Sequence, residues 1–112
     1  MLTVYTAPID YDGSKKSLDV TVKSGDEVFA PTWKMVMKTK KGEMTWEKYK
    51  RKYRELMRDS YQKNFERWQE LLAKKEIVLL CYCQSPQQCH RRLLAEMLEE
   101  AGARYAGEIN KN

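Results

Sequence analysis

The chain has 112 residues, of which 42% are hydrophobic and 33% charged, and it carries a formal charge of +5. This composition predicts one folded domain over residues 1–112 and excludes a disordered chain. No apolar run approaches the ~20 residues that a membrane-spanning helix needs, and the N-terminal sequence MLTVYTAPID lacks the pattern of a signal peptide. We therefore expect a cytoplasmic protein with reduced cysteines and no membrane partner.

The N-terminal third predicts two short strands. Residues 2–6 (LTVYT) are β-rich, and residues 18–22 (LDVTV) alternate between apolar and polar side chains. Residues 7–17 between them are rich in turn-forming types and predict a loop. The apolar, aromatic segment 28–33 predicts a further loop, which leads into a short helix over residues 32–38.

The spacing of apolar residues changes at Thr45 to that of a helix. Thr45 is the expected N-cap, with Glu47 in the first turn. Ser60 is expected to restart the helix after a bend. Core packing explains the aromatic and aliphatic stripe that runs along one face of this region: Trp46, Tyr49, Tyr53, Leu56, Met57, Tyr61, Phe65, Trp68 and Leu72.

The apolar run 77–83 (IVLLCYC) suits a central strand that is covered on both faces. Ser85 as N-cap, Pro86 at the first helical position and Gln88 after it predict the start of a helix, which Gly102 ends. Residues 103–109 predict a last strand. This order predicts an α/β, Rossmann-like three-layer domain with a small, mostly parallel sheet flanked by helices.

All three cysteines and the only histidine lie within CYCQSPQQCHRR at residues 81–92. Parallel sheets bind ligands beyond the carboxyl ends of their strands, and this segment lies at that edge. The predicted helix start places Cys89 in the first turn, near unpaired N–H groups and the positive end of the helix dipole. This field would favour the thiolate of an exposed Cys89, or would hold a bound phosphate or carboxylate. A buried residue that packs the helix on the strand is a third interpretation.

The neighbouring side chains leave further alternatives open. His90 could act as an acid or base, could hydrogen-bond a ligand, or could serve in capping or packing. Arg91 could bind a carboxylate or phosphate through two hydrogen bonds, or could pair with an acidic side chain such as Glu108. Cys81 and Cys83 share one face of the predicted strand. Cys83 lies nearer to the expected site, and Cys81 is expected in the core.

The pattern C-x-C-x5-C-H supplies four potential metal ligands, but it lacks the paired C-x2-C spacing of structural zinc sites. Adjacent Cys89 and His90 would point about 100° apart on a helix, which makes joint ligation awkward. We therefore expect no metal and no cofactor.

The segment LLCYCQSPQQCHRRLLAEMLEEAG resembles the C-terminal signature of domain-of-unknown-function family 488. That signature has an apolar strand ending in Leu-Cys, a short loop with proline, and Cys-His-Arg at the start of a helix. The resemblance extends to VYT at residues 4–6 and to LDVTV followed by FAPTW. It implies a Rossmann-like domain without an established general activity. The matching positions are Cys81, Cys89, His90 and Arg91, with Thr6 and Trp33 as weaker matches near the expected pocket.

Two features qualify this resemblance. Many family members have an acidic residue where this chain has Cys83, so the role of that carboxylate does not carry over. Compact versions like this chain are similar to proteins of bacteriophage genomes. By analogy, they suggest a host-directed, anti-defence role such as the capture of a nucleotide immune signal.

The leading functional hypothesis is a module that binds a small anionic, nucleotide-like ligand at the carboxyl edge of the sheet. The helix start with Arg91 would contact phosphate, and Trp33, Tyr5 or Tyr11 would stack on a base. The ligand-binding candidates from the residues and the resemblance together are Arg91, Ser85, Gln88, Cys83, Thr6, Tyr5, Trp33 and Tyr11.

Two other functions remain open. The chain could be a transferase or hydrolase that uses Cys89 as nucleophile with His90 or a water as base. It could also bind nucleic acid through residues 34–54, which carry nine Lys or Arg against two Glu. Three Trp and seven Tyr leave aromatic surface for a homodimer.

Overall fold

The computed structural model describes residues 1–82 and 89–109. Its four strands are β1 (Thr3–Pro8), β2 (Ser17–Asp19), β3 (Glu76–Cys81) and β4 (Arg104–Glu108). They form one sheet in the order β2-β3-β1-β4, in which every pairing is parallel. The predicted α/β class with a small parallel sheet is confirmed.

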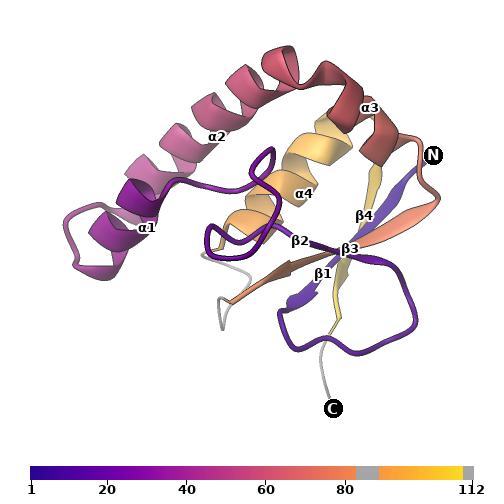
Figure 1. Ribbon diagram of the computed structural model, residues 1–112, viewed down its shortest axis with the longest axis horizontal. Coiled ribbons are helices and arrows are strands. Elements are labelled where there is room, and N and C mark those ends of the chain that lie inside the picture. Colours follow the sequence, from indigo (N-terminus) through magenta and orange to yellow (C-terminus); the bar gives the residue numbers. More distant parts are fainter. Residues whose placement is uncertain (83–88, 110–112) are drawn as a thin grey trace.

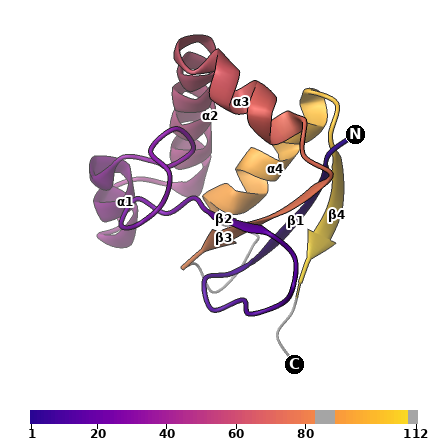
Figure 2. The same ribbon diagram turned by 45° about the vertical axis from the view of Figure 1, so that its right-hand side comes forward.

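Four helices accompany this sheet in the described part of the chain: α1 (Trp33–Lys40), α2 (Trp46–Lys63), α3 (Phe65–Leu72) and α4 (His90–Glu100). Figure 1 and Figure 2 both place α4 between the sheet and α2, so the sheet, α4 and α2 form successive layers. Within the described ranges, no helix is both long and apolar enough to cross a membrane.

The strands β3 and β1 are the two central strands of the sheet. Five of the six residues of β3, Ile77 to Cys81, are buried, as expected for a strand that is covered on both faces. Its register aligns Val4 of β1 with Ile77 and Pro8 with Cys81. The carboxyl end of β3 therefore lies beside that of β1, with β2 on the other side.

The main core lies between the sheet and the helices. Val4 and Leu79 of the sheet, Leu94 and Leu98 of α4, and Tyr53 of α2 are all fully buried there. A smaller apolar cluster covers the opposite face of the sheet and contains Ala7, Val78 and Leu80, with Tyr5, Ile9, Tyr11 and Ile109 packed against them.

The helix boundaries follow local capping chemistry. Thr32 and Thr45 are the N-caps of α1 and α2, and each side chain accepts a hydrogen bond from a backbone N–H three residues later. At the end of α4, Gly102 has φ +109 and donates to Glu99 O, while Ala103 N donates to Leu98 O. This pair of bonds is a Schellman motif, which confirms Gly102 as the end of the helix.

The strand expected over residues 18–22 is Ser17–Asp19 instead, and two predicted helix boundaries are also wrong. The helix does not restart at Ser60, which lies inside α2; the break falls at Asn64, between α2 and α3. Nor does α4 run from Pro86 through Cys89, because Cys89 is an extended N-cap with φ −144 and ψ 141, and the helix begins at His90. The expected caps Ser85 and Pro86 lie outside the described residues.

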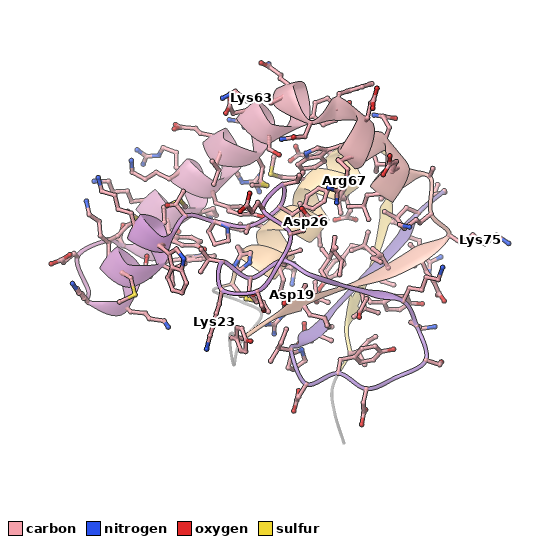
Figure 3. All side chains as sticks on the ribbon, in the orientation of Figure 1. Asp19, Lys23, Asp26, Lys63, Arg67 and Lys75 are labelled. Atoms are coloured by element: carbon pink, nitrogen blue, oxygen red, sulfur yellow. The ribbon has the colours of Figure 1, made fainter. Side chains whose placement is uncertain are left out.

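The loop between β2 and α1 is fixed on α2 and α3. Tyr53 Oη donates to Phe29 O at 2.7 Å, and Ser60 Oγ donates to Val28 O at 2.6 Å. Burial raises the pKa of the Tyr53 hydroxyl well above its ordinary value, so this group remains a donor. Figure 3 shows Arg67 of α3 reaching toward Asp26 of the loop, with which it forms an ion pair.

Asp19 fixes the first turn of the same loop. Its carboxylate accepts from Thr21 N at 2.8 Å and from Ser24 Oγ at 2.5 Å. Burial alone would raise the pKa of Asp19, but the hydrogen bonds from Ser24 and Thr21 outweigh it and lower the pKa. The ionised carboxylate therefore contributes stability.

We predict that Asp19→Asn lowers the free energy of unfolding at pH 7 by about 1–2 kcal/mol, because the amide loses the charge-assisted bond to Ser24. The folded-state pKa lies below the unfolded value of about 3.9. The contribution is therefore fully present above pH ~4 and is lost as the pH falls further. Urea unfolding at several pH values checks this, with the exposed Asp12→Asn as control. A difference between Asp19→Asn and the parent that does not shrink below pH ~4 would contradict it.

Candidate functional site

A cavity of about 520 Å³ opens beyond the carboxyl ends of β2 and β3. Four parts of the chain line it: the segment that follows β2, the helix α1, the start of α2, and the residues where β3 ends and α4 begins. The described lining residues are Thr21, Val22, Lys23, Trp33, Val36, Thr39, Lys40, Trp46, Tyr49, Cys81, Tyr82, Cys89 and His90. The predicted position at the carboxyl edge of the sheet therefore does hold a cavity.

The floor of this cavity, as we call it here, consists of Cys81, Cys89 and His90. Cys81 ends β3, Cys89 is the N-cap of α4, and His90 is the first helical residue. All three are at least 96% buried. Their two sulfur atoms and an imidazole nitrogen lie within 4.8 Å of one another. A strand end and a helix start thus bring two soft donors and one titratable ring to a single point.

The ring of His90 is held in one orientation. Its Nε2 lies 2.6 Å from Val20 O, and its Nδ1 lies 3.6 Å from Cys81 Sγ. A backbone carbonyl can only accept a hydrogen bond, so Nε2 carries the proton. In the neutral ring, Nδ1 then presents its lone pair to the Cys81 sulfur. The ring also packs at a tilt on Tyr53, with centroids 5.5 Å apart.

Arg91 lies behind the floor and is fully buried. Its Nε and Nη2 donate to the two carboxylate oxygens of Glu108 at 3.2 and 2.9 Å. Its Nη1 lies 3.4 Å from Cys81 O and 3.6 Å from Cys89 Sγ. Burial alone would lower the pKa of Arg91, but the hydrogen bond to Glu108 and the neighbouring negative groups raise it. The guanidinium therefore stays charged beside the sulfur atom.

The walls of the cavity are mainly aromatic and apolar. Trp46 stacks on Tyr49 with centroids 5.3 Å apart, and Tyr49 stacks in turn on Tyr53. Trp33 on α1 is 55% exposed and lines the same space. Lys23 and Lys40 supply positive charge at the wall. The site can therefore hold a flat apolar group and an anionic group together.

The family model described as the active DUF488-N3 subclade matches residues 1–102. The chain belongs to this DUF488 family. No curated protein and no solved structure shows significant similarity to it.

The structure brings only part of the predicted ligand set of this DUF488 chain to the cavity. Trp33, Cys89 and His90 line it. Arg91 is not among the described lining residues, because it is engaged with Glu108, the alternative that sequence analysis left open. Cys83, Ser85 and Gln88 lie outside the described residues.

The remaining predicted residues lie on or near β1. Thr6 is buried and its Oγ1 is 2.7 Å from Tyr105 Oη. Tyr5 and Tyr11 pack in the smaller apolar cluster on the opposite face of the sheet. None of these three is among the described residues of the cavity wall.

Several cavity residues of this DUF488 chain were missed. Trp46 and Tyr49 were assigned to core packing, which Tyr49 also serves, and the loop residues Thr21 and Lys23 were not considered. One sequence feature could have indicated these residues. The apolar, aromatic segment 28–33 leads directly into a basic helix, so aromatic and cationic side chains lie close together in the sequence. That feature does not say which helix face meets the sheet edge.

The basic segment 34–54 of the chain forms parts of α1 and α2. Two of its cations are already in ion pairs: Lys50 with Glu47, and Arg54 with Glu96 and Glu100. Binding of nucleic acid through this segment stays a prediction.

We predict that Glu108→Gln lowers the free energy of unfolding of this DUF488 protein by about 3 kcal/mol or more, because it leaves the buried guanidinium of Arg91 uncompensated. Glu96→Gln is the matched control, since Glu96 pairs with partly exposed Arg54 and Arg92. That change should cost at most about 1 kcal/mol. Urea unfolding monitored by tryptophan fluorescence measures both; equal small losses would contradict a structural role of the buried pair.

Proposed function

We propose that the cavity binds a small anionic molecule with a planar ring, of which a nucleotide is the closest chemical class. The observation that carries this proposal is the juxtaposition of exposed Trp33 with Lys23 and Lys40 on the wall of one cavity at the carboxyl edge of a parallel sheet. Ligands of such sheets bind at that edge. The role we attach to the site is capture of a nucleotide signal, in line with the host-directed role suggested by the resemblance to phage proteins.

The aromatic residues support the ring-binding part of this proposal. Trp33 is exposed at the cavity, whereas Trp46 is held by its stack on Tyr49. A rigid ring beside an exposed one offers a planar ligand two apolar surfaces, and stacking on an aromatic side chain is worth about 1–3 kcal/mol per base.

The cations support the anion-binding part. Lys23 and Lys40 come from two different segments, the loop after β2 and the end of α1, and both line the cavity. Among the described lining residues there is no Asp or Glu to oppose them. A phosphate held between two flexible ammonium groups gains attraction without requiring one fixed geometry.

We predict that at least one member of a panel of nucleoside mono-, di- and triphosphates and cyclic dinucleotides binds, as measured by calorimetry on protein stripped of metal by a chelator. Trp33→Ala should weaken that binding about tenfold or more, through loss of stacking. Phe65→Ala is the aromatic control, because Phe65 is 50% exposed on α3 and is not among the described cavity residues.

Lys40→Gln should weaken the same ligand several-fold, and more so at low salt. Lys75→Gln is the matched control: Figure 3 shows Lys75 at the amino end of β3, pointing away from the molecule. Failure of every panel member to bind, or equal effects of the variants and their controls, would overturn the proposal.

A second candidate function is thiol-dependent group transfer at the cavity floor. Two observations favour it: the subclade that matches this chain is described as active, and His90 Nδ1 lies 3.6 Å from Cys81 Sγ. The imidazole can take the proton of that thiol, and the thiolate can then attack an electrophilic carbon of a bound substrate. A carbon–sulfur bond forms, the bond from that carbon to its leaving group breaks, and the imidazolium gives its proton to the leaving group. The sequence pattern favours Cys89 as the nucleophile, and Cys89 also lies on the floor, so both cysteines are candidates.

We predict for this second function that iodoacetamide modifies a floor cysteine faster in the native parent than in His90→Gln, because the base is lost. Peptide mass spectrometry identifies the modified residue, and a nucleotide-like ligand should protect it. Equal modification rates in both proteins would contradict the activation of a floor cysteine by His90.

A further inference from the structure

We propose that Cys81, Cys89 and His90 form an open, three-ligand site for a thiophilic divalent cation of the zinc class, on the floor of the cavity. This inference does not rest on the proposed function, because metal binding is measured without a nucleotide. Two thiolates and one imidazole are the donors that Zn²⁺ prefers over carboxylate-binding cations. In this chain they meet within 4.8 Å.

The spacing of the donors matches the requirement of the metal. Zinc–sulfur bonds of ~2.3 Å and zinc–nitrogen bonds of ~2.0–2.1 Å at a tetrahedral angle separate sulfur from nitrogen by about 3.6 Å. Cys81 Sγ and His90 Nδ1 lie 3.6 Å apart. The same geometry requires about 3.8 Å between two sulfur atoms. With all three donors within 4.8 Å, the cluster needs to contract by no more than about an ångström.

The second nitrogen of His90 supports this assignment. A metal-binding histidine usually donates its other N–H to a carbonyl or carboxylate, which fixes the tautomer and aims the lone pair at the metal. Here His90 Nε2 donates to Val20 O at 2.6 Å. The ring is therefore already in the tautomer that ligation requires, with Nδ1 turned to the thiols.

The charge around the floor also suits ligated thiolates. Arg91 Nη1 lies 3.6 Å from Cys89 Sγ, where it can donate to a thiolate without displacing it from a metal. The charge of Arg91 is already balanced by Glu108 at 2.9 Å. Two thiolates and one divalent cation form a neutral set, so the site as a whole buries no net charge. Binding sends as many as two thiol protons to solvent.

The backbone at Cys89 allows Cys89 and His90 to bind one metal ion together. On one continuous helix their side chains would point about 100° apart. Cys89 is instead an extended N-cap, and only His90 is helical. The change of backbone conformation between the two residues lets both side chains reach Cys81.

Among the residues that the structure describes, no fourth His, Cys, Asp or Glu joins this cluster. All three donors line the cavity, so the fourth coordination position would face it. Sites with three protein ligands and one open position hold a water or a substrate atom at the metal, whereas structural zinc sites are closed by four protein ligands. The ligand class expected at the open position is therefore an anionic oxygen, from water or from a bound small molecule.

The test is a titration of reduced, chelator-treated protein with ZnCl₂ in competition with a chromophoric chelator, followed by substitution with CoCl₂. One cation per chain is expected. Cobalt should give thiolate-to-metal charge-transfer absorption together with the intense visible bands of a tetrahedral complex. These spectra come from the parent protein, so the test stands even where a variant fails to fold.

Cys81→Ser, Cys89→Ser and His90→Gln should each weaken zinc binding at least tenfold, with folding confirmed by circular dichroism. Cys83→Ser, the same change at the third cysteine, is the matched control and should keep the one-to-one stoichiometry. Absence of binding by the parent, a cobalt complex without thiolate absorption, or a loss in Cys83→Ser as large as in Cys81→Ser would each overturn the proposal. Nucleotide binding by metal-free protein is measured separately, so either proposal can fail alone.

Discussion

The hydrogen bond between His90 Nε2 and Val20 O is the interaction on which the site depends. It joins the first residue of α4 to the chain that has just left β2, and so fixes where the cavity wall begins. It also sets the tautomer of the ring, because a carbonyl can only accept. With Nε2 committed to Val20, Nδ1 is directed at Cys81, and the floor has one defined arrangement of donors.

The buried pair of Arg91 and Glu108 holds the same junction from behind. It connects the start of α4 to β4, while Nη1 contacts the carbonyl that ends β3. Burying a guanidinium is costly unless its charge and its hydrogen bonds are satisfied. Glu108 balances the charge of Arg91 through two hydrogen bonds, and Nη1 contacts Cys81 O and Cys89 Sγ. Arg91 thus shapes the field at the sulfur atoms without lining the described cavity.

The parts of the fold that depend on local chemistry were predictable. Thr45, Gly102 and the apolar run before Cys81 act through caps and periodicity, which are written in adjacent residues. The start of α4 was not predictable in this way. The Ser-Pro pair predicts a helix that already includes Cys89, but Cys89 is extended and its side chain lies on the cavity floor. Whether Arg91 binds a ligand or an acidic side chain depends on Glu108, which lies seventeen residues away on β4. Pairing across elements of that kind has no local signature.

The same geometry limits what the cavity floor can do at one time. A thiolate bound to a metal is a weaker nucleophile than a free thiolate, so metal binding and thiol chemistry at Cys81 and Cys89 compete. An aromatic, anionic ligand is compatible with either. Metal binding and thiol chemistry both depend on His90 presenting Nδ1 to the sulfur atoms. Because His90 is the only histidine, nitrogen-15 NMR of the metal-free protein reports its tautomer without ambiguity. We predict that Nε2 carries a proton, as its hydrogen bond to Val20 O requires; a neutral ring protonated only at Nδ1 would contradict this.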